Sequence, residues 1–141
     1  MKQDIIELIF QLKSICFTKE ESICRELGLS PAEFRGLLAM IPESDISCNI
    51  LSRKMGLSVS RGSRVTDKMI ESGYLQFSES KEDRRVITVR LTKKGVNIQR
   101  KIHKSLEECE KSILKKMSKE ETSAFRVSML KIYDSLLERK S

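Results

Sequence analysis

The amino-acid sequence predicts a mostly α-helical fold that carries one small β-hairpin. Apolar residues recur at steps of three and four over most of the 141-residue chain, as they do along amphipathic helices. In two short runs, "YLQFS" and "VITVRL", the pattern changes to alternation, which is typical of paired strands. The chain has the length of one domain, and no change of composition divides it into independent halves. We therefore expect a single, helix-rich domain.

Two helices are expected before Pro42. The first runs to about Leu27 and closes at Gly28, with apolar positions at Ile5, Leu8, Ile9, Leu12, Ile15 and Cys16. The second begins in "LSPAEF", where Ser30 fits an N-cap, Pro31 fits the first helical position and Glu33 completes a capping box. Its apolar positions are Phe34, Leu37, Leu38 and Ile41.

Two short capped helices follow and form a helix-turn-helix. Ser47 caps the first, which ends at Gly56 and carries Ile50, Leu51 and Met55. Ser58 caps the second, which ends at Gly73 and has its expected inward positions at Val59, Gly62, Val65, Met69 and Ile70. Two helices joined by a tight turn that contains glycine are the arrangement of this motif.

The outer face of the second helix suits the major groove of DNA. Arg61, Arg64 and Lys68 are spaced i, i+3 and i+7, so they lie along one stripe. The hydroxyls and amides at its start favour phosphates, and arginine can bind guanine through two hydrogen bonds. The predicted contact residues are Ser58, Ser60, Arg61, Ser63, Arg64 and Lys68. The alternative is a helix that is merely soluble, and a basic stripe alone is weakly specific.

A β-hairpin directly after such a helix is a wing. Its expected inward positions are Leu75 and Phe77 in the first strand and Ile87, Val89 and Leu91 in the second, with Thr88 and Arg90 outward. The polar segment "ESKEDRR" joins the strands, and its cations can enter the narrow, electronegative minor groove. The predicted tip residues are Lys81, Asp83, Arg84 and Arg85.

The positive charge is concentrated in this middle third. The whole chain carries a net charge of +7, and residues 47–95 hold eleven Lys or Arg against five Asp or Glu. An excess of six positive charges is expected of a surface that meets a polyanion such as DNA. A solvated basic surface is the alternative explanation.

Two long helices close the chain. Thr92 caps the first, with apolar positions at Val96, Ile98, Ile102, Leu106, Cys109, Ile113 and Met117. Ser118 caps the second and Glu121 completes its capping box, with apolar positions at Ala124, Phe125, Met129, Ile132, Tyr133, Leu136 and Leu137. The small winged motif cannot cover this much apolar helix, so we expect the surplus to pair with a second copy.

Other classes of protein are disfavoured. No Gly-rich phosphate loop, H-E-x-x-H or paired loop carboxylates indicate an enzyme, and no cofactor is expected. His103 and Glu107 form an exposed i, i+4 pair rather than a metal site. The four cysteines contain no C-x-x-C pair, so we expect reduced and mostly buried thiols. The start lacks a secretory signal and no run is long enough for a membrane span, which predicts a cytoplasmic protein.

The segments "LSRKMGLSVSRGSRVTDKMIESGYL" and "EDRRVITVRLTKKG", within this order of helices, resemble the MarR family of winged helix-turn-helix transcriptional regulators. The resemblance covers the whole chain as one domain, with residues 30–95 as the DNA-binding lobe and residues 1–28 and 96–141 as dimerisation helices. It implies a homodimeric repressor that binds an inverted repeat with half-sites about 10 base pairs apart, and that a ligand or oxidation releases. By the same resemblance Arg85 reads the minor groove, Asp83 orients it, and Ser60, Arg61, Ser63 and Arg64 contact bases and phosphates.

The signal that such a protein would read stays open. Leu12, Phe34 and Leu38 are candidates to line an effector pocket, although they equally fit an ordinary core, which we favour. Cys16 and Cys24 are candidate redox residues, with Lys19 or Arg25 available to activate a thiolate. Eight residues separate these cysteines, about 12 Å along a helix, which is too far for an intrachain disulfide. The alternative function is an architectural or protein-binding winged-helix protein without an effector.

Overall fold

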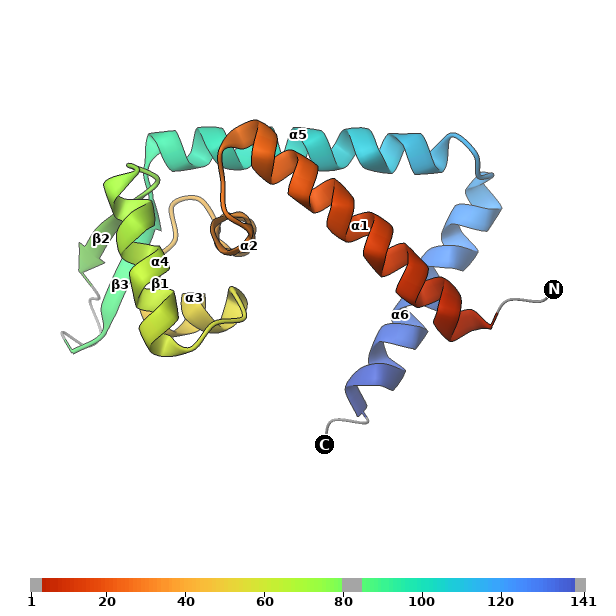
Figure 1. The fold of residues 1–141 in the computed structure, drawn as a ribbon, viewed down its shortest axis with the longest axis horizontal. Helices are drawn as coiled ribbons and strands as arrows, with labels where there is room; N and C mark the ends of the chain where they lie inside the picture. Colours follow the sequence, from red (N-terminus) through yellow and green to blue (C-terminus); the bar gives the residue numbers. More distant parts are fainter. Residues whose placement is uncertain (1–3, 80–84, 139–141) are drawn as a thin grey trace. The chain divides into compact units, whose positions relative to one another are not determined.

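The computed structural model describes residues 4–79 and 85–138. The elements follow in the order α1 (Ile5–Leu27), α2 (Pro31–Ala39), β1 (Ile46–Ser47), α3 (Cys48–Lys54), α4 (Val59–Glu71), β2 (Leu75–Glu79), β3 (Ile87–Leu91), α5 (Lys93–Leu114) and α6 (Lys119–Glu138). Figure 1 shows mostly helices and one small sheet, which confirms the predicted fold class. The chain divides within α5 into two compact units, residues 1–103 and 104–141.

The predicted caps delimit the first two helices. Gly28 ends α1 in the left-handed conformation, with φ of 69°. Ser30 then begins α2 with a complete capping box, because its hydroxyl accepts from the Glu33 amide and its own amide donates to the Glu33 carboxylate, both at 3.1 Å. These local bonds satisfy amides that the helix itself leaves unpaired.

The helix-turn-helix is confirmed in α3 and α4. The Ser47 hydroxyl accepts from the amide of Ile50 at 3.2 Å, and that of Ser58 accepts from the amide of Arg61 at 3.3 Å. The two helices pack closely at Gly62, where a Cβ atom would overlap the side chain of Ser52. Glycine at this position therefore sets how near α4 lies to α3.

The sheet has one more strand than the sequence predicts. Its order is β1-β3-β2, with both pairs antiparallel. The hairpin register places Phe77 opposite Val89, and the added strand places Ile46 opposite Val89 on the other side. A strand of two residues is too short to show alternation, so periodicity could not reveal it.

Some residues of the hairpin and of the helix-turn-helix that were predicted to face inward are exposed, so this part of the prediction is wrong. Phe77 and Ile87 are 61% and 62% exposed, whereas Thr88, which was expected outside, is buried and donates from its hydroxyl to the Ser78 carbonyl at 2.7 Å. Val59 and Ile50 are also exposed. Leu75, Val89 and Leu91 are buried, and Phe77 is exposed although Val89, its partner in the register, is buried, so alternation alone does not set burial in this hairpin.

One core fills the first unit. The most completely buried apolar side chains come from its separate elements and are Leu37, Leu51, Met55, Met69, Leu75, Val89 and Ile102. Gln99 of α5 is also buried, and its amide donates at 2.7 Å to the carbonyls of both Leu37 and Met40. Since these carbonyls end α2, Gln99 ties α2 to the first turns of α5.

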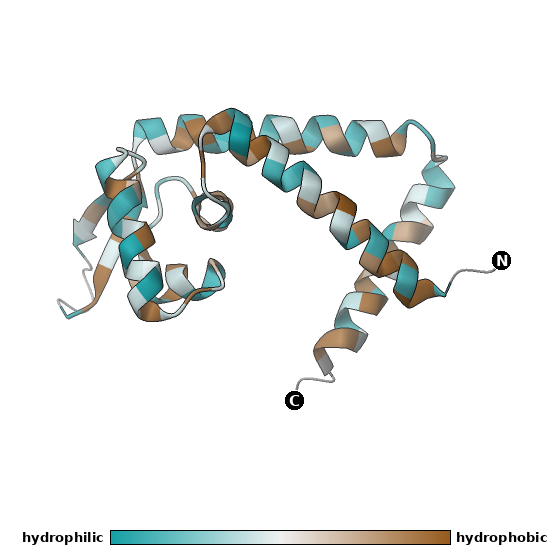
Figure 2. Cartoon of the chain, viewed as in Figure 1, coloured by the Kyte–Doolittle hydropathy of each residue, from teal (hydrophilic) through white to brown (hydrophobic). Residues whose placement is uncertain are grey.

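The second unit holds the end of α5 and all of α6. Ser118 and Glu121 form the predicted capping box, with bonds of 3.0 and 3.2 Å. Most of the apolar face expected to be inward on α6 is exposed in the single chain, as are large side chains on α1, and both helices carry brown stretches in Figure 2. The exposed apolar residues of α6 are Phe125, Val127, Met129, Leu130, Tyr133, Leu136 and Leu137.

Candidate nucleic-acid interface

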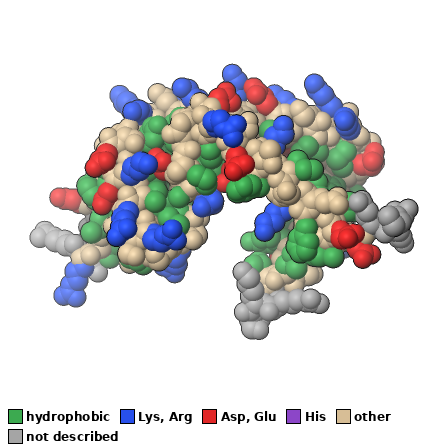
Figure 3. All heavy atoms as spheres, viewed as in Figure 1, with side chains coloured by type: hydrophobic (Ala, Val, Ile, Leu, Met, Phe, Trp, Pro, Cys, Tyr) green, Lys and Arg blue, Asp and Glu red, His purple; other side chains and the backbone are tan. Residues whose placement is uncertain are grey.

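The second helix of the helix-turn-helix, α4, presents the predicted polar face to solvent. All six predicted residues on it are exposed: Ser58, Ser60, Arg61, Ser63, Arg64 and Lys68. Figure 3 shows Lys and Arg side chains, in blue, over the part of the first unit that holds α4 and the hairpin. Among the described residues, Arg61, Arg64 and Lys68 form no ion pair. Their charge is therefore available to an outside anion.

The start of α4 adds to this positive field. The helix has 13 residues and no acidic residue in its first turn. Its unpaired first amides and its dipole favour an anion at this end. The Ser58 hydroxyl, which caps the helix, lies 3.4 Å from that of Ser60. A nucleic-acid backbone would thus meet hydroxyls, amides and the arginine stripe on a single element.

The tip of the wing is only partly described. Lys81, Asp83 and Arg84 lie outside the described residues, and so does the predicted contact between Asp83 and Arg85. Arg85 is exposed just before β3. Arg90, farther along that strand, forms an ion pair with Asp45, in which its Nε donates at 2.8 Å to the carboxylate.

A cavity of about 350 Å³ lies between α3, α4 and the hairpin. Its lining includes Cys48, Thr66, Asp67, Phe77 and Arg85. Thr66 is only 2% exposed, and its hydroxyl oxygen has no hydrogen-bond partner among the described residues. Burial, reinforced by the Asp67 carboxylate, raises the pKa of the Cys48 thiol. No local sequence pattern reveals this cavity, because its walls come from three separate segments.

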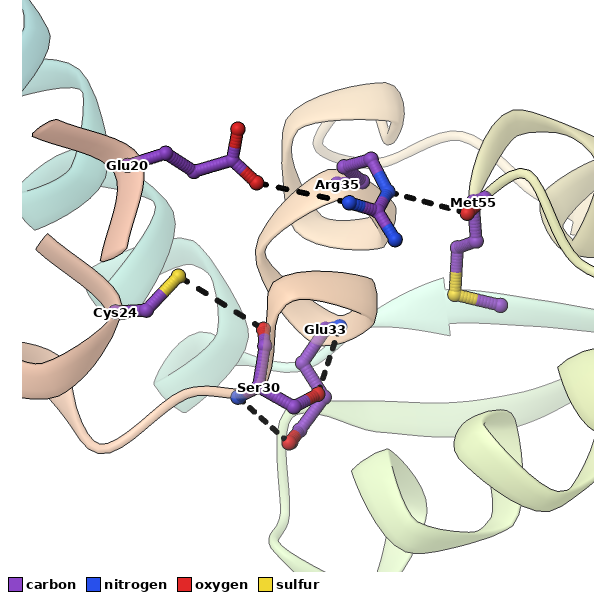
Figure 4. Close-up of polar contacts among 6 residues, drawn as sticks. All are labelled: Glu20, Cys24, Ser30, Glu33, Arg35 and Met55. Atoms are coloured by element: carbon purple, nitrogen blue, oxygen red, sulfur yellow. Dashed lines mark hydrogen bonds and ion pairs between the residues drawn. The ribbon is translucent and has the colours of Figure 1, made fainter. Parts of the chain in front are cut away.

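The cysteines differ in exposure, and among the described residues all four are free thiols. Cys16 is exposed beside Phe10 and Phe17 on α1, contrary to the expectation of mostly buried thiols. Cys24 is buried, with its sulfur 4.0 Å from the Ser30 carbonyl (Figure 4).

The surroundings of Cys24 disfavour its thiolate. Burial raises its pKa, the Glu20 carboxylate raises it further, and the guanidinium of Arg35 only opposes these effects. A raised pKa lowers the fraction of reactive thiolate at neutral pH. These effects disfavour a redox role for Cys24, and the choice between Cys16 and Cys24 as a redox residue stays a prediction.

The three candidate effector-pocket residues have different environments. Phe34 is part of the buried core, Leu38 is half-buried, and Leu12 is half exposed on α1. Phe34 thus fits the interpretation as ordinary core. A pocket shared by these three residues stays a prediction.

The described residues form neither a metal site nor a membrane span. Within residues 4–79 and 85–138, no cluster of three or more His, Cys, Asp or Glu side chains is arranged to hold a metal ion. None of the helices in the same described ranges is long and apolar enough to cross a membrane.

The chain is similar to known transcriptional regulators. Residues 29–87, which contain α2, the helix-turn-helix and β2, match the sequence model of the MarR family. Over 129 residues the chain is 24% identical to a Bacillus subtilis (strain 168) protein named "Uncharacterized HTH-type transcriptional regulator YsmB", covering 92% of this chain and 88% of that protein. These similarities are to transcriptional regulators rather than enzymes, as the absence of catalytic motifs predicts.

Solved structures show the same fold along nearly the whole chain. A MarR family protein from Bacillus stearothermophilus superimposes with a TM-score of 0.78 at 24% identity, covering 94% of this chain and 95% of that one. The apo form of MarR from E. coli gives a TM-score of 0.76 at 16% identity, covering 94% and 98%. The winged-helix arrangement predicted from the motifs is therefore confirmed.

Proposed function

Since this chain belongs to the MarR family of winged-helix transcriptional regulators, we propose that it is a homodimeric repressor that binds an inverted-repeat operator. The observation that carries the proposal is the exposed stripe of Arg61, Arg64 and Lys68 on α4, which no described carboxylate neutralises. A stripe of this kind on the second helix of a helix-turn-helix fits the major groove.

Each copy would contact DNA with two elements. The start of α4, with Ser58, Ser60 and Ser63, would bind phosphates and base edges, and Arg61 or Arg64 would read guanine. The wing would follow the backbone into the adjacent minor groove through Lys81, Arg84 and Arg85, with Asp83 orienting Arg85. The positive charges of α4 and of the wing would thus bind adjacent grooves of the same DNA duplex.

The exposed apolar helices support a dimer. Ile5, Phe10 and Ile15 on α1 are more than half exposed in the single chain, and so are Leu130 and Tyr133 on α6. Large exposed apolar faces of this kind mark interfaces with other proteins. A second copy that covers them would also supply the second recognition helix that an inverted repeat requires.

Release from DNA would follow an effector or oxidation. The cavity between α3, α4 and the hairpin adjoins Ser63 and Arg85, so a small molecule there could displace both DNA-contacting elements. The predicted pocket at Leu12, Phe34 and Leu38 is the other candidate site. For oxidation, Cys16 is better suited than Cys24, because it is exposed and Cys24 is buried with a raised pKa.

The test is selection of bound sequences from a random double-stranded library at near-physiological salt, with and without oxidant. A dimeric regulator should recover one inverted repeat with half-sites about 10 base pairs apart. Loss of that sequence in oxidant alone would assign a sensing role to a thiol. Recovery of no preferred sequence would overturn the repressor proposal and favour an architectural DNA-binding protein.

A further inference from the structure

We propose that Arg35 is a positioning residue for DNA binding, which joins α1 to the turn of the helix-turn-helix. Its guanidinium makes two contacts in opposite directions (Figure 4). The Nε atom donates to the carbonyl of Met55 at 3.1 Å, and Nη1 lies 3.6 Å from Oε1 of Glu20. A single side chain on α2 thus connects an N-terminal helix with the segment that leads into α4.

The Met55 carbonyl lies at the turn between α3 and α4. Met55 caps the end of α3, and its side chain is fully buried. Gly56 then turns the chain with φ of 72°, and Ser58 begins α4. A hydrogen bond from a charged donor to this carbonyl restrains the turn from outside, at the point that determines how α4 leaves α3.

The other contact depends on the same guanidinium. Oxygen Oε1 of Glu20 is shielded from water and has no hydrogen-bond partner among the described residues. The distance of 3.6 Å to Arg35 is too long for a hydrogen bond but within the range of an ion pair. The charge of Arg35 therefore compensates this carboxylate, and α1 is held to α2 at that point.

The helix that carries Arg35 is anchored at both ends. The capping box of Ser30 and Glu33 fixes its start, and the buried amide of Gln99 binds the carbonyls of Leu37 and Met40 at its end. Arg35 is therefore displayed from an element with little freedom to shift. Through its contacts with Glu20 and Met55, the Arg35 side chain would transmit a displacement of α1 to the turn between α3 and α4.

The contribution of Arg35 is geometric more than energetic. Its side chain is 43% exposed and that of Glu20 is 27% exposed, and ion pairs this accessible to water add little to stability. A planar guanidinium presents separate nitrogens to its two partners, whereas lysine has one nitrogen on a flexible stem and should keep at most one of these two contacts. Both Arg35→Lys and Arg35→Met should therefore free the turn while leaving the core intact.

The first experiment needs no DNA. Amide hydrogen exchange is measured at Gly56 and Leu57, whose amides donate to the carbonyls of Arg53 and Ser52 in the turn. Exchange in Arg35→Met and Arg35→Lys should be about five- to tenfold faster there, as expected for the loss of one hydrogen-bond restraint. The amide of Tyr74, which closes the far end of α4, should be unchanged.

The matched control is Arg25→Met on α1. Like Arg35→Met, it removes one guanidinium and leaves an unbranched apolar side chain. Arg25 is exposed and has no ion pair or side-chain hydrogen bond among the described residues. Wild-type exchange in this control is expected. Unchanged exchange at Gly56 and Leu57 in both Arg35 variants would overturn the proposal, as would wild-type behaviour of Arg35→Lys alone.

The second experiment rests on the proposed function. Affinity is measured for the selected operator and for versions with one base pair added or removed between the half-sites. The Arg35 variants should bind the best operator about five- to tenfold more weakly and should lose most of the wild-type preference for its spacing. An equal loss at all spacings, together with a lower Tm, would assign Arg35 only a structural role and overturn the proposal.

The two proposals fail in different ways. If the wild-type protein selects no operator, the proposed function is wrong, and the exchange experiment still decides whether Arg35 restrains the turn. If the wild-type protein binds and both Arg35 variants keep its affinity and spacing preference, the positioning role is wrong and the proposed function stands.

Discussion

Arg85 is the described residue of the wing whose substitution is expected to weaken specific DNA binding. In the proposed complex its guanidinium enters the minor groove beside α4. Arg85→Ala should weaken operator binding by about 1 to 3 kcal/mol, and thermal unfolding should stay unchanged because the side chain is exposed. Titration of labelled operator measures the change. Arg100→Ala, an exposed arginine on α5, is the control, and unchanged affinity in Arg85→Ala would remove Arg85 from the interface.

Thr66 reports whether the cavity beside α4 is occupied in solution. Its buried hydroxyl has no partner among the described residues, and an unsatisfied buried polar group costs about 1 to 3 kcal/mol. Thr66→Val keeps the shape and removes the hydroxyl, so it should leave the free energy of unfolding unchanged or raise it. Denaturant unfolding measures this. A clear loss of stability would mean that a molecule in the cavity satisfies the hydroxyl.

The thiols of Cys24, which is buried, and Cys48, which is half-buried, should react slowly. Burial raises both pKa values, so the folded protein disfavours the thiolate. Stability gained from keeping the thiols neutral is present below the pKa of the unfolded chain and is lost as pH rises above it. At pH 8, alkylation of both should be much slower in the native protein than in urea. Rapid native labelling of Cys24 with loss of DNA binding would instead support a sensor.

At the scale of elements, the close contact of α3 with α4 is the main constraint on the helix-turn-helix. Alanine is better than glycine within a helix by about 1 kcal/mol, but a Cβ at Gly62 would overlap Ser52. Overpacking of this kind costs about 1 to 3 kcal/mol, so Gly62→Ala should lower both Tm and operator affinity. Arg64→Ala, on the exposed face of the same helix, should lower only affinity. A stabilised Gly62→Ala protein would show that the helices can separate at no cost.

At the scale of the whole molecule, the net charge of +7 predicts a strong salt dependence of DNA binding. Lys and Arg that neutralise phosphates release condensed cations, so affinity falls as salt rises. For 6 to 10 phosphate contacts by a dimer, affinity should drop by about 10³ to 10⁵ between 50 and 200 mM salt. Operator titrations over this range measure the slope. A flat dependence would contradict binding through the basic surface of α4 and the wing.

Much of the fold was predictable because its signals are local. Ser30, Ser47, Ser58 and Ser118 cap helices in the structure as expected, since a cap needs only a hydroxyl and an amide about three residues later. The stripe on α4 was predictable for the same reason, because residues three and four apart in a helix share a face whatever lies around them.

Local patterns were therefore enough to predict the helices with their ends, the hairpin and the cationic face of α4. Local patterns could not show which apolar residues are buried, because burial depends on which other segments pack over them. Phe77 and Ile87 continue the alternation of their strands but are exposed, although Val89 opposite Phe77 is buried, and Thr88 is buried and donates a hydrogen bond across the hairpin. The cavity at Thr66 and the link from Glu20 through Arg35 to Met55 likewise join residues far apart in sequence, and no local pattern records such contacts.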